Sequence, residues 1–170
     1  QGWKGDKNLI VLCGGEALRK ELAEKLLANF KEVHNVYGPT ETTVWSTTAI
    51  VNQSMLTDQR FGSIPLGKPM LNTKIKITDA LGNETPLGVQ GQLLIGGDGV
   101  AQGYHNRAEL NAEKFITLPS GERFYQTGDL VKLFHDGQLA FIQRNDEQVK
   151  VRGYRIELGE VESALNKCEG

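Results

Sequence analysis

The sequence predicts a fold of class α/β plus β-barrel, in which a parallel-sheet unit precedes an antiparallel barrel and a short α+β segment. Three observations support this prediction. A continuous apolar run near the N-terminus leads into glycines and a helical repeat, alternating β-type segments separated by turn residues follow, and the pattern changes again after residue 144. We therefore divide the chain into residues 1–50, 51–144 and 145–170.

The first unit begins with a strand that we expect to be buried on both faces. Residues 9–13 are all apolar and end at Gly14-Gly15, as in a parallel sheet that is covered on both sides. Apolar residues at helical spacing between Leu18 and Phe30 predict a helix, and a second apolar run at 33–37 completes a βαβ unit. Because one such unit leaves strand edges without neighbours, we expect the chain to belong to a larger fold.

The middle unit has the alternation of half-buried antiparallel strands. Asp136-Gly137 predicts a hairpin with a type I′ turn, and residues 108–115 predict a short helix with Leu110 and Phe115 facing inward. The candidate strands are 42–50, 74–78, 92–95, 124–126, 130–133 and 139–143.

The last unit starts at a short charged linker, residues 144–147. A strand at 147–151 and a turn at Arg152-Gly153 precede a predicted helix over 157–167. Val161, Ala164 and Leu165 are expected on its inward face.

Composition excludes several classes of function. The 19 Lys and Arg residues and 21 Asp and Glu residues are intermixed and sum to a net charge of −2, which disfavours nucleic acid and anionic membranes as partners. No apolar stretch is long enough to span a bilayer, so we expect a cytoplasmic protein. Cys13 and Cys168 lack metal-ligand spacing, and so do the histidines, which we interpret as packing or surface residues: His34, His105 and His135.

Two short segments combine turn residues with acids. Residues 35–41 leave a buried strand through Gly38-Pro39 and end in Thr40 and Glu41, a hydroxyl and a carboxylate that could hold a phosphate and its Mg²⁺. Residues 125–130 place Asp129 in a glycine turn, where a carboxylate can accept hydrogen bonds from a sugar diol. The alternatives, a simple turn before a strand and a solvated turn aspartate, stay open on these residues alone.

The order and spacing of four segments resemble the core motifs of amino-acid adenylation domains of nonribosomal peptide synthetases. The segments are residues 35–41, 91–104, 125–130 and 146–162, and the last of them, with Gln148-Val149-Lys150-Val151-Arg152-Gly153-Tyr154-Arg155 at its centre, is the most specific. These domains belong to the adenylate-forming superfamily that also contains acyl-CoA ligases and luciferases. The resemblance implies the end of the second α/β subdomain, the barrel subdomain and the start of the C-terminal subdomain.

The resemblance also implies a role for each matching residue. Thr40 and Glu41 would contact the ATP phosphates, with Glu41 holding Mg²⁺, and Lys150 would act after domain rotation about a hinge at Asp146. The nucleotide-binding positions would be Gly14, Gly15, Glu16, Asn35, Tyr37, Asp129, Phe141 and Arg144. The amino-acid pocket would be lined by Val11, Cys13, Val36, Val44 and Trp45.

The implied reaction joins an amino acid to ATP and then transfers the aminoacyl group to phosphopantetheine on a peptidyl carrier protein domain, beside a condensation domain in the parent synthetase. We find no match to the upstream phosphate loop, to the aspartate that holds the substrate amino group or to the C-terminal catalytic lysine. We therefore expect a fragment that is inactive by itself. The alternatives are an acyl-CoA or aryl-acid ligase of the same superfamily and a non-catalytic binding fragment.

Overall fold

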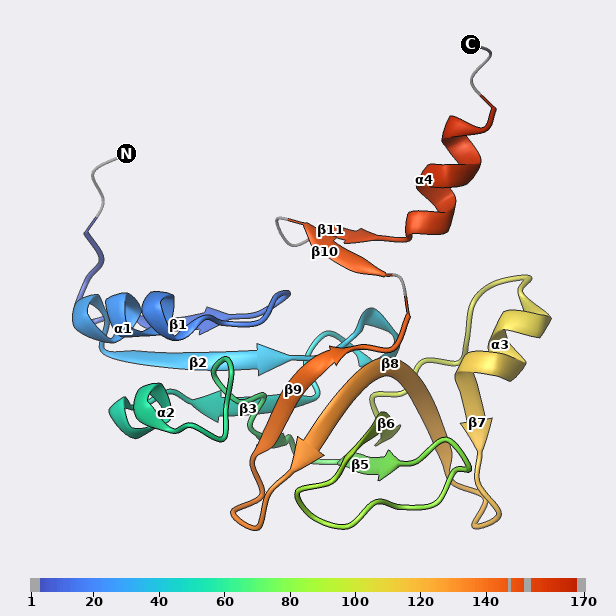
Figure 1. Cartoon of the computed structure of the whole chain (residues 1–170), viewed down its shortest axis with the longest axis horizontal. Coiled ribbons are helices and arrows are strands. Elements are labelled where there is room, and N and C mark those ends of the chain that lie inside the picture. The colour runs from blue at the N-terminus through green and yellow to red at the C-terminus, as the bar shows by residue number, and fades with distance from the viewer. Residues whose placement is uncertain (1–3, 147, 152–153, 168–170) are drawn as a thin grey trace.

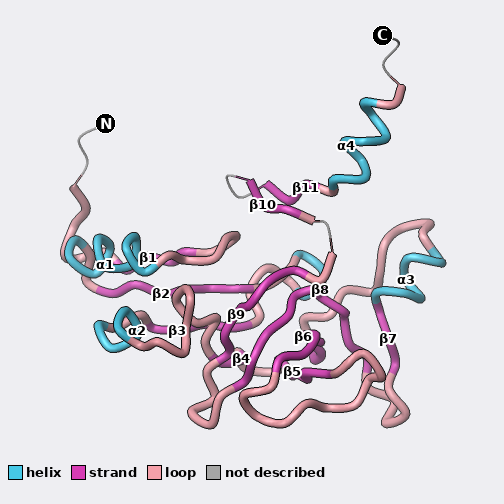
Figure 2. Tube along the Cα trace, in the orientation of Figure 1, coloured by secondary structure: helices cyan, strands magenta, loops and turns pink. Residues whose placement is uncertain are grey.

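A computed structural model describes residues 4–146, 148–151 and 154–167, and these form a parallel-sheet unit, a larger antiparallel sheet and a C-terminal hairpin with a helix (Figure 1). Figure 2 shows that strands dominate the centre of the molecule and that helices lie around it. Gly153 and Cys168 lie outside the described residues, as do the side chains of Lys150 and Arg155. No helix in the described part of the chain has the length and apolarity that a membrane span requires.

The first sheet has the strand order β1-β2-β3-β4. Strands β1 (Ile10–Cys13) and β2 (Glu32–Tyr37) are parallel and are joined by helix α1 (Lys20–Asn29), which confirms the predicted βαβ unit. Strands β3 (Thr47–Ile50) and β4 (Lys68–Pro69) add in antiparallel pairs. The core between this sheet, α1 and helix α2 (Gln53–Thr57) contains Leu18, Ala23, Phe30, Val33, Ala49, Val51, Met55 and Ile64.

Burial of β1 on both faces was a wrong expectation. Val11 and Cys13 pack toward the core, but Ile10 and Leu12 are each about half exposed, at 52% and 51%. The reason is that β1 is the outer strand of the sheet in the described chain, and that α1 covers one face only. Leu22 of α1, which belongs to the predicted apolar repeat, is also exposed.

The strand predicted from residue 42 begins later, at Thr47. Residues Thr40–Thr42 form a 3-10 turn, η1, and Thr43 and Val44 then adopt positive φ angles of 61° and 68°. Such angles break an extended strand, so pairing with β2 starts only after them. The first sheet continues past residue 50 to β4, whereas the division of the chain at residues 50 and 144 stays a prediction.

The second sheet is antiparallel, as predicted, and curves around its own core (Figure 1). Its order is β5-β6-β8-β7, and β9 also pairs with β8. The bounds are β5 (Thr73–Thr78), β6 (Gln90–Gly97), β7 (Phe115–Thr117), β8 (Arg123–Leu133) and β9 (Leu139–Arg144). Its core contains Leu66, Ile77, Leu93, Ile95, Val131 and Leu139.

Strand β8 corrects one expectation about this sheet. The segments 124–126 and 130–133 are parts of one strand, so Asp129 lies within a strand and not in a turn between two strands. Gly128 has a φ of 75°, and the pairing with β6 shifts register between Gln92 and Leu94. The glycine is therefore a bulge position that redirects the strand without ending it.

The hairpin between β8 and β9 is confirmed, but its turn is not of type I′. Phe134 and Gln138 close the loop, with the Phe134 N–H donating to the Gln138 carbonyl at 3.0 Å. Gly137 has a φ of 79°, and Asp136 does not have a positive φ. The loop is thus three residues long and needs the left-handed conformation only at its glycine.

The remaining helices expose more apolar surface than predicted. Helix α3 (Ala108–Lys114) leaves Leu110 38% exposed, while Phe115, the first residue of β7, is buried as expected. The C-terminal strands β10 (Val149–Val151) and β11 (Tyr154–Ile156) form a hairpin, and helix α4 (Leu158–Leu165) extends away from the two sheets (Figure 1). The predicted inward residues Val161, Ala164 and Leu165 are exposed because α4 packs against neither sheet.

Candidate active site

A pocket of about 440 Å³ lies where the first sheet meets the second. Its walls come from the loop after β1, the carboxyl end of β2, the paired strands β8 and β9, and the segment that leads into β10. This is the place where open α/β sheets bind ligands, because the loops diverge beyond the carboxyl ends of parallel strands. The lining residues are Gly15, Glu16, Ala17, Arg19, Asn35, Val36, Tyr37, Gly38, Leu66, Asp129, Phe141, Arg144, Gln148 and Val149.

The polar centre of the pocket is Asp129, whose residue is only 4% exposed. The Tyr37 hydroxyl donates to Asp129 Oδ2, and Arg144 Nη1 donates to Asp129 Oδ1 at 2.9 Å. Thr127 Oγ1 accepts a 3.0 Å hydrogen bond from the Asp129 main-chain N–H. Because a buried charge requires partners, the hydrogen bonds from Tyr37 and Arg144 allow a carboxylate to lie in the pocket wall.

Burial and the neighbouring Asp129 carboxylate raise the pKa of the Tyr37 hydroxyl well above its usual range. Tyr37 therefore stays protonated at neutral pH and acts as a hydrogen-bond donor to Asp129.

Arg144 connects this carboxylate to the predicted hinge. Its Nε and Nη2 donate to Asp146 Oδ1 and Oδ2 at 2.8 and 2.5 Å, and Nη1 also donates to the Thr127 carbonyl at 3.0 Å. Burial disfavours the guanidinium charge, but the carboxylates of Asp146 and Asp129 outweigh it and raise the pKa of Arg144. Desolvation works against the Asp146 charge as well, yet the Arg144 guanidinium lowers the pKa of Asp146.

Gly128 makes room for this ion pair. A Cβ at this position would lie 2.6 Å from Asp146 Oδ2 and 2.9 Å from Arg144 Nη2, and the φ of 75° is itself unfavourable for other residues. The glycine is therefore needed both for the bulge and for the approach of the two side chains.

Asn35 has a structural role in the pocket wall. It is 2% exposed, and its amide donates to the carbonyls of Pro65 and Ile64 at 2.8 and 3.3 Å. Asn35 thus ties β2 to the loop before β4 while it lines the pocket.

The structure brings most predicted nucleotide-binding residues together. Gly15, Glu16, Asn35, Tyr37, Asp129, Phe141 and Arg144 all line the pocket. Gly14 does not line it, but a Cβ there would lie 2.6 Å from the Val36 carbonyl, so this glycine lets the loop approach β2. The nucleotide roles themselves stay predictions.

Thr40 and Glu41 lie in η1 and are not part of this pocket. Thr40 is exposed, whereas Glu41 is 6% exposed and accepts a hydrogen bond from the Tyr104 hydroxyl at 2.5 Å. Burial and this hydrogen bond raise the pKa of Tyr104 above its usual range. No group of three or more His, Cys, Asp or Glu side chains forms a metal cluster among the described residues.

Of the five residues predicted to line the amino-acid pocket, Val36 alone lines the pocket described above, and the amino-acid role of all five stays a prediction. Val36 lines the pocket, Val11 and Cys13 pack against the first core, and Val44 and Trp45 are 61% and 44% exposed. Burial raises the pKa of the Cys13 thiol, as expected for a packing residue. Val44 has a positive φ and so lies outside any extended strand, which the sequence pattern does not reveal.

Sequence reasoning missed several residues of the site. No site role was predicted for Tyr104, Thr127 or Gln148, although each lies in one of the four segments that carry the resemblance. For Tyr104 the reason is that its partner is distant in sequence, since Tyr104 and Glu41 are 63 residues apart and no local pattern could pair them. Thr127 and Gln148 have partners close in sequence, in Asp129 and Asp146, so the turn around each aspartate was a signal that could have found them.

Comparisons with known proteins agree with this geometry. A family model described as AMP-binding enzyme matches residues 6–105. A linear gramicidin synthase of Brevibacillus parabrevis is 49% identical over 160 residues, 92% of this chain and 2% of that protein. Bacitracin synthase 1 of Bacillus licheniformis is 48% identical over 164 residues, 94% of this chain and 3% of that protein. The chain therefore spans only a few per cent of the length of these relatives.

Solved structures show the same arrangement. A nonribosomal peptide synthetase protein with adenylation and PCP domains, bound to a vinylsulfonamide inhibitor, has a TM-score of 0.86 and 33% identity, covering 95% of this chain and 28% of its own. A four-domain nonribosomal peptide synthetase bound to AMP and glycine has a TM-score of 0.77 and 48% identity, covering 99% of this chain and 13% of its own. The predicted class, an α/β unit followed by a barrel subdomain of an adenylate-forming fold, is confirmed.

Proposed function

Because this chain belongs to the AMP-binding enzyme family, we propose that it is part of an adenylation domain that activates an amino acid. The reaction is amino acid plus ATP giving aminoacyl-AMP and pyrophosphate. Transfer to the thiol of phosphopantetheine on a peptidyl carrier protein domain follows, with a condensation domain as a further partner in the synthetase. The similarity to peptide synthetases over more than nine-tenths of this chain supports this choice within the family.

One observation carries the nucleotide assignment, namely the buried Asp129 carboxylate in the pocket wall. A carboxylate offers about four lone-pair sites, and Tyr37 and Arg144 occupy two of them. The remaining sites fit the two hydroxyls of a ribose, which are donors at adjacent carbons. Phe141 lines the same pocket and provides an aromatic wall for the nucleoside.

Thr40 and Glu41 fit the phosphate side of the proposed site. Mg²⁺ binds one or two carboxylates together with phosphate oxygens, so one carboxylate with a neighbouring hydroxyl suits a metal that the triphosphate also ligates. Glu41 would hold the ion and Thr40 would donate to a phosphate oxygen. When bound, Mg²⁺ supplies neutralisation of the phosphate charge.

The chemistry asks little acid or base catalysis of the chain. A substrate carboxylate is already a nucleophile, so one of its oxygens forms the new bond to the α-phosphorus while the bond to the pyrophosphate oxygen breaks. Alignment of the two reactants and neutralisation of charge account for the rate. Asp129 and Arg144 would align the nucleoside.

We propose a second conformation for thioester formation. Asp146 would be the pivot, and the hairpin of β10 and β11, which carries Lys150, would turn toward the site. The carrier thiol would then attack the aminoacyl carbonyl and release AMP. The two hydrogen bonds from Arg144 Nε and Nη2 to the Asp146 carboxylate would hold Asp146 in the conformation seen here. In this motion residues 145–170 would turn as one subdomain part relative to the other two, residues 1–50 and 51–144.

The test is amino-acid-dependent exchange between pyrophosphate and ATP, measured with the complete adenylation domain, meaning this segment together with the remainder of the domain. One amino acid from a panel should support exchange and then load onto a carrier domain. The apolar candidates Val11, Cys13, Val36, Val44 and Trp45 favour an uncharged side chain. Exchange with aryl or fatty acids only, with CoA as acceptor, would show the rival ligase, and no exchange would refute the proposal.

The 170-residue chain alone should show no exchange and at most weak nucleotide binding. It corresponds to 28% and 30% of the length of two solved adenylation-domain chains. The phosphate loop, the amino-group aspartate and the catalytic lysine, which would act together with Glu41 and Asp129, have no match in it. When catalytic groups act as a unit, the loss of one of them lowers the rate about as much as the loss of several. Robust exchange by the purified 170-residue chain would contradict this prediction.

A further inference from the structure

We propose that Tyr104 is a positioning residue that orients the Glu41 carboxylate for the metal, and that the barrel-side loop at residues 98–104 exists to hold it there. This inference rests on the proposed function, because it assigns Glu41 to Mg²⁺. In this proposal Tyr104 acts through Glu41 and has no direct contact with substrate or metal. Its hydroxyl donates to Glu41 Oε1 at 2.5 Å, and Glu41 lies in a different sheet unit.

The loop is tied to the η1 turn at two further points. The Ala101 N–H donates to the Glu41 carbonyl at 2.8 Å, and Thr43 Oγ1 donates to the Gly99 carbonyl at 2.7 Å. Main chain and side chain of Glu41 are therefore both held from the same loop. A carboxylate fixed in this way has lost most of its rotational freedom before a ligand arrives.

The opposite side of Tyr104 is held just as firmly. Its N–H donates to Asn111 Oδ1 at 2.7 Å, and Asn111 Nδ2 donates back to the Tyr104 carbonyl at 2.9 Å. This pair fixes the Tyr104 backbone to helix α3. The ring packs edge-on against Phe115, with centroids 5.5 Å apart, and the Tyr125 hydroxyl lies 3.4 Å from the Tyr104 hydroxyl.

Arg123 anchors the base of the loop. Its guanidinium donates to the carbonyls of Ala101 and Gln102 and lies 4.5 Å from the centroid of the Phe115 ring. Contacts thus run from Arg123 of the second sheet through residues 101–104 to the Glu41 carboxylate beside the first sheet. Packing alone would not require a phenol here, because the ring contacts would be the same for phenylalanine.

The test compares Tyr104→Phe with the wild type in the complete adenylation domain. Binding of Mn²⁺, used as a spectroscopic substitute for Mg²⁺, is titrated by electron paramagnetic resonance in the presence of an ATP analogue that cannot react. Loss of a partner of a ligating carboxylate typically weakens metal affinity by about 10- to 100-fold, so we expect at least a tenfold weaker Mn²⁺ affinity. Affinity for the analogue without metal should not change.

Two further variants make the test specific. Tyr154→Phe removes the hydroxyl of an exposed tyrosine in β11 and should bind Mn²⁺ like the wild type. Asn111→Ala keeps the Tyr104 hydroxyl but frees its backbone, and should weaken Mn²⁺ binding in the same direction by a smaller factor. A purely structural role would lower the melting temperature and the active fraction while leaving the Mn²⁺ affinity of the folded protein unchanged.

The outcomes separate the two proposals. If the wild type binds Mn²⁺ with the analogue but Tyr104→Phe binds it equally well, the positioning role is refuted and the proposed function survives. If the wild type shows no nucleotide-dependent Mn²⁺ binding, the assignment of Glu41 falls and the positioning role falls with it. Should Tyr104→Phe fail to fold, unchanged Mn²⁺ affinity in Asn111→Ala would refute the inference.

Discussion

Replacing Asp129 by asparagine should weaken nucleotide binding without unfolding the protein. The asparagine oxygen can accept from Arg144 Nη1, which is 2.9 Å from Asp129 Oδ1, and its NH₂ can donate to the Tyr37 hydroxyl, which can turn to accept. The Thr127 hydroxyl continues to accept from the main chain at residue 129. The internal hydrogen bonds thus persist, but those from Tyr37 and Arg144 now reach a neutral amide, so the stability cost should be roughly 2–3 kcal/mol, below the about 5–15 kcal/mol that is typical of a folded domain.

The ribose loses hydrogen-bond strength for the same reason. Hydrogen bonds to a charged group contribute about 1.5–3 kcal/mol and neutral ones about 0.5–1.5 kcal/mol, so each ribose hydroxyl loses roughly 1–1.5 kcal/mol. For two hydroxyls the loss is roughly 2–3 kcal/mol, or about 30- to 150-fold in Kd. Isothermal titration of AMP into the complete adenylation domain would measure it, with a melting curve as the check on folding.

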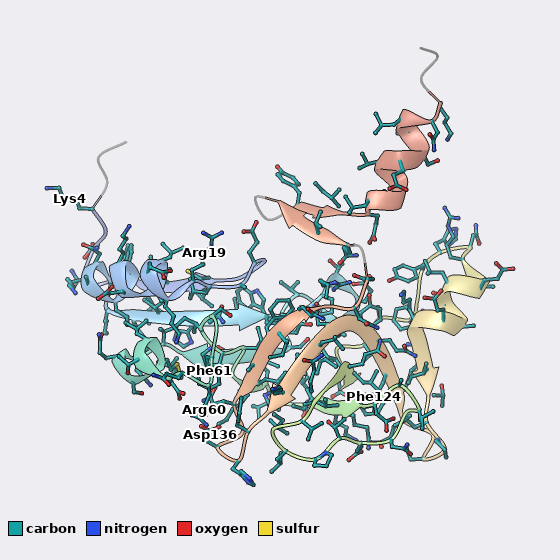
Figure 3. All side chains as sticks on the ribbon, viewed as in Figure 1. Lys4, Arg19, Arg60, Phe61, Phe124 and Asp136 are labelled. Carbon is teal, nitrogen blue, oxygen red and sulfur yellow. The ribbon has the colours of Figure 1, made fainter. Side chains whose placement is uncertain are left out.

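Asp136→Asn is the matched control, because it changes the same groups at an exposed carboxylate in the β8–β9 hairpin. Figure 3 shows Asp136 beside Arg60, away from the pocket-lining Arg19. Its AMP affinity should equal that of the wild type. An unchanged Kd for AMP in Asp129→Asn, with the fold intact, would refute the ribose assignment.

Three other changes have defined outcomes. Gly128→Ala should lower the melting temperature more than Gly82→Ala. Both glycines have a positive φ, but of these two only Gly128 has atoms within 4 Å of the added Cβ. Equal melting temperatures of the two variants would refute the steric argument. Arg60→Ala should lower the melting temperature more at neutral pH than at about pH 2. The Gln138 backbone N–H and Arg60 lower the pKa of Asp136, Arg60 lowers the pKa of Asp58, and this stabilisation is lost only as pH falls through these lowered values; an equal loss at both pH values would contradict it. Asp146→Pro should slow transfer to the carrier thiol far more than pyrophosphate exchange, because proline fixes the backbone at the proposed pivot. Asp146→Ala loses the two hydrogen bonds from Arg144 but keeps backbone freedom, so it should spare transfer. Equal loss of both steps in the proline variant would exclude Asp146 as the pivot.

Local patterns in the sequence predicted several of the elements, but they did not predict α2, β4, β7 or β11, and they divided β8 into two strands. The apolar run at β1, the helical repeat of α1 and the Asp136-Gly137 hairpin are such patterns, and each of them produced the expected element. The motif segments also indicated the family, because their residues and spacing can be read without coordinates. What local pattern cannot encode is which face of an element is covered, so the burial of Leu12, Leu110 and Val161 was predicted wrongly.

The assembly of the site, in contrast, depends on contacts between distant parts of the chain. Tyr37 reaches Asp129 across 92 residues of sequence, and Tyr104 reaches Glu41 across 63. These pairs depend on how two sheets pack and on a bulge at Gly128, and neither leaves a periodic trace in the sequence. A hydroxyl, a carboxylate and a guanidinium can each be solvated separately. Only their burial in one wall makes the carboxylate depend on the other two, because a desolvated charge must be paired.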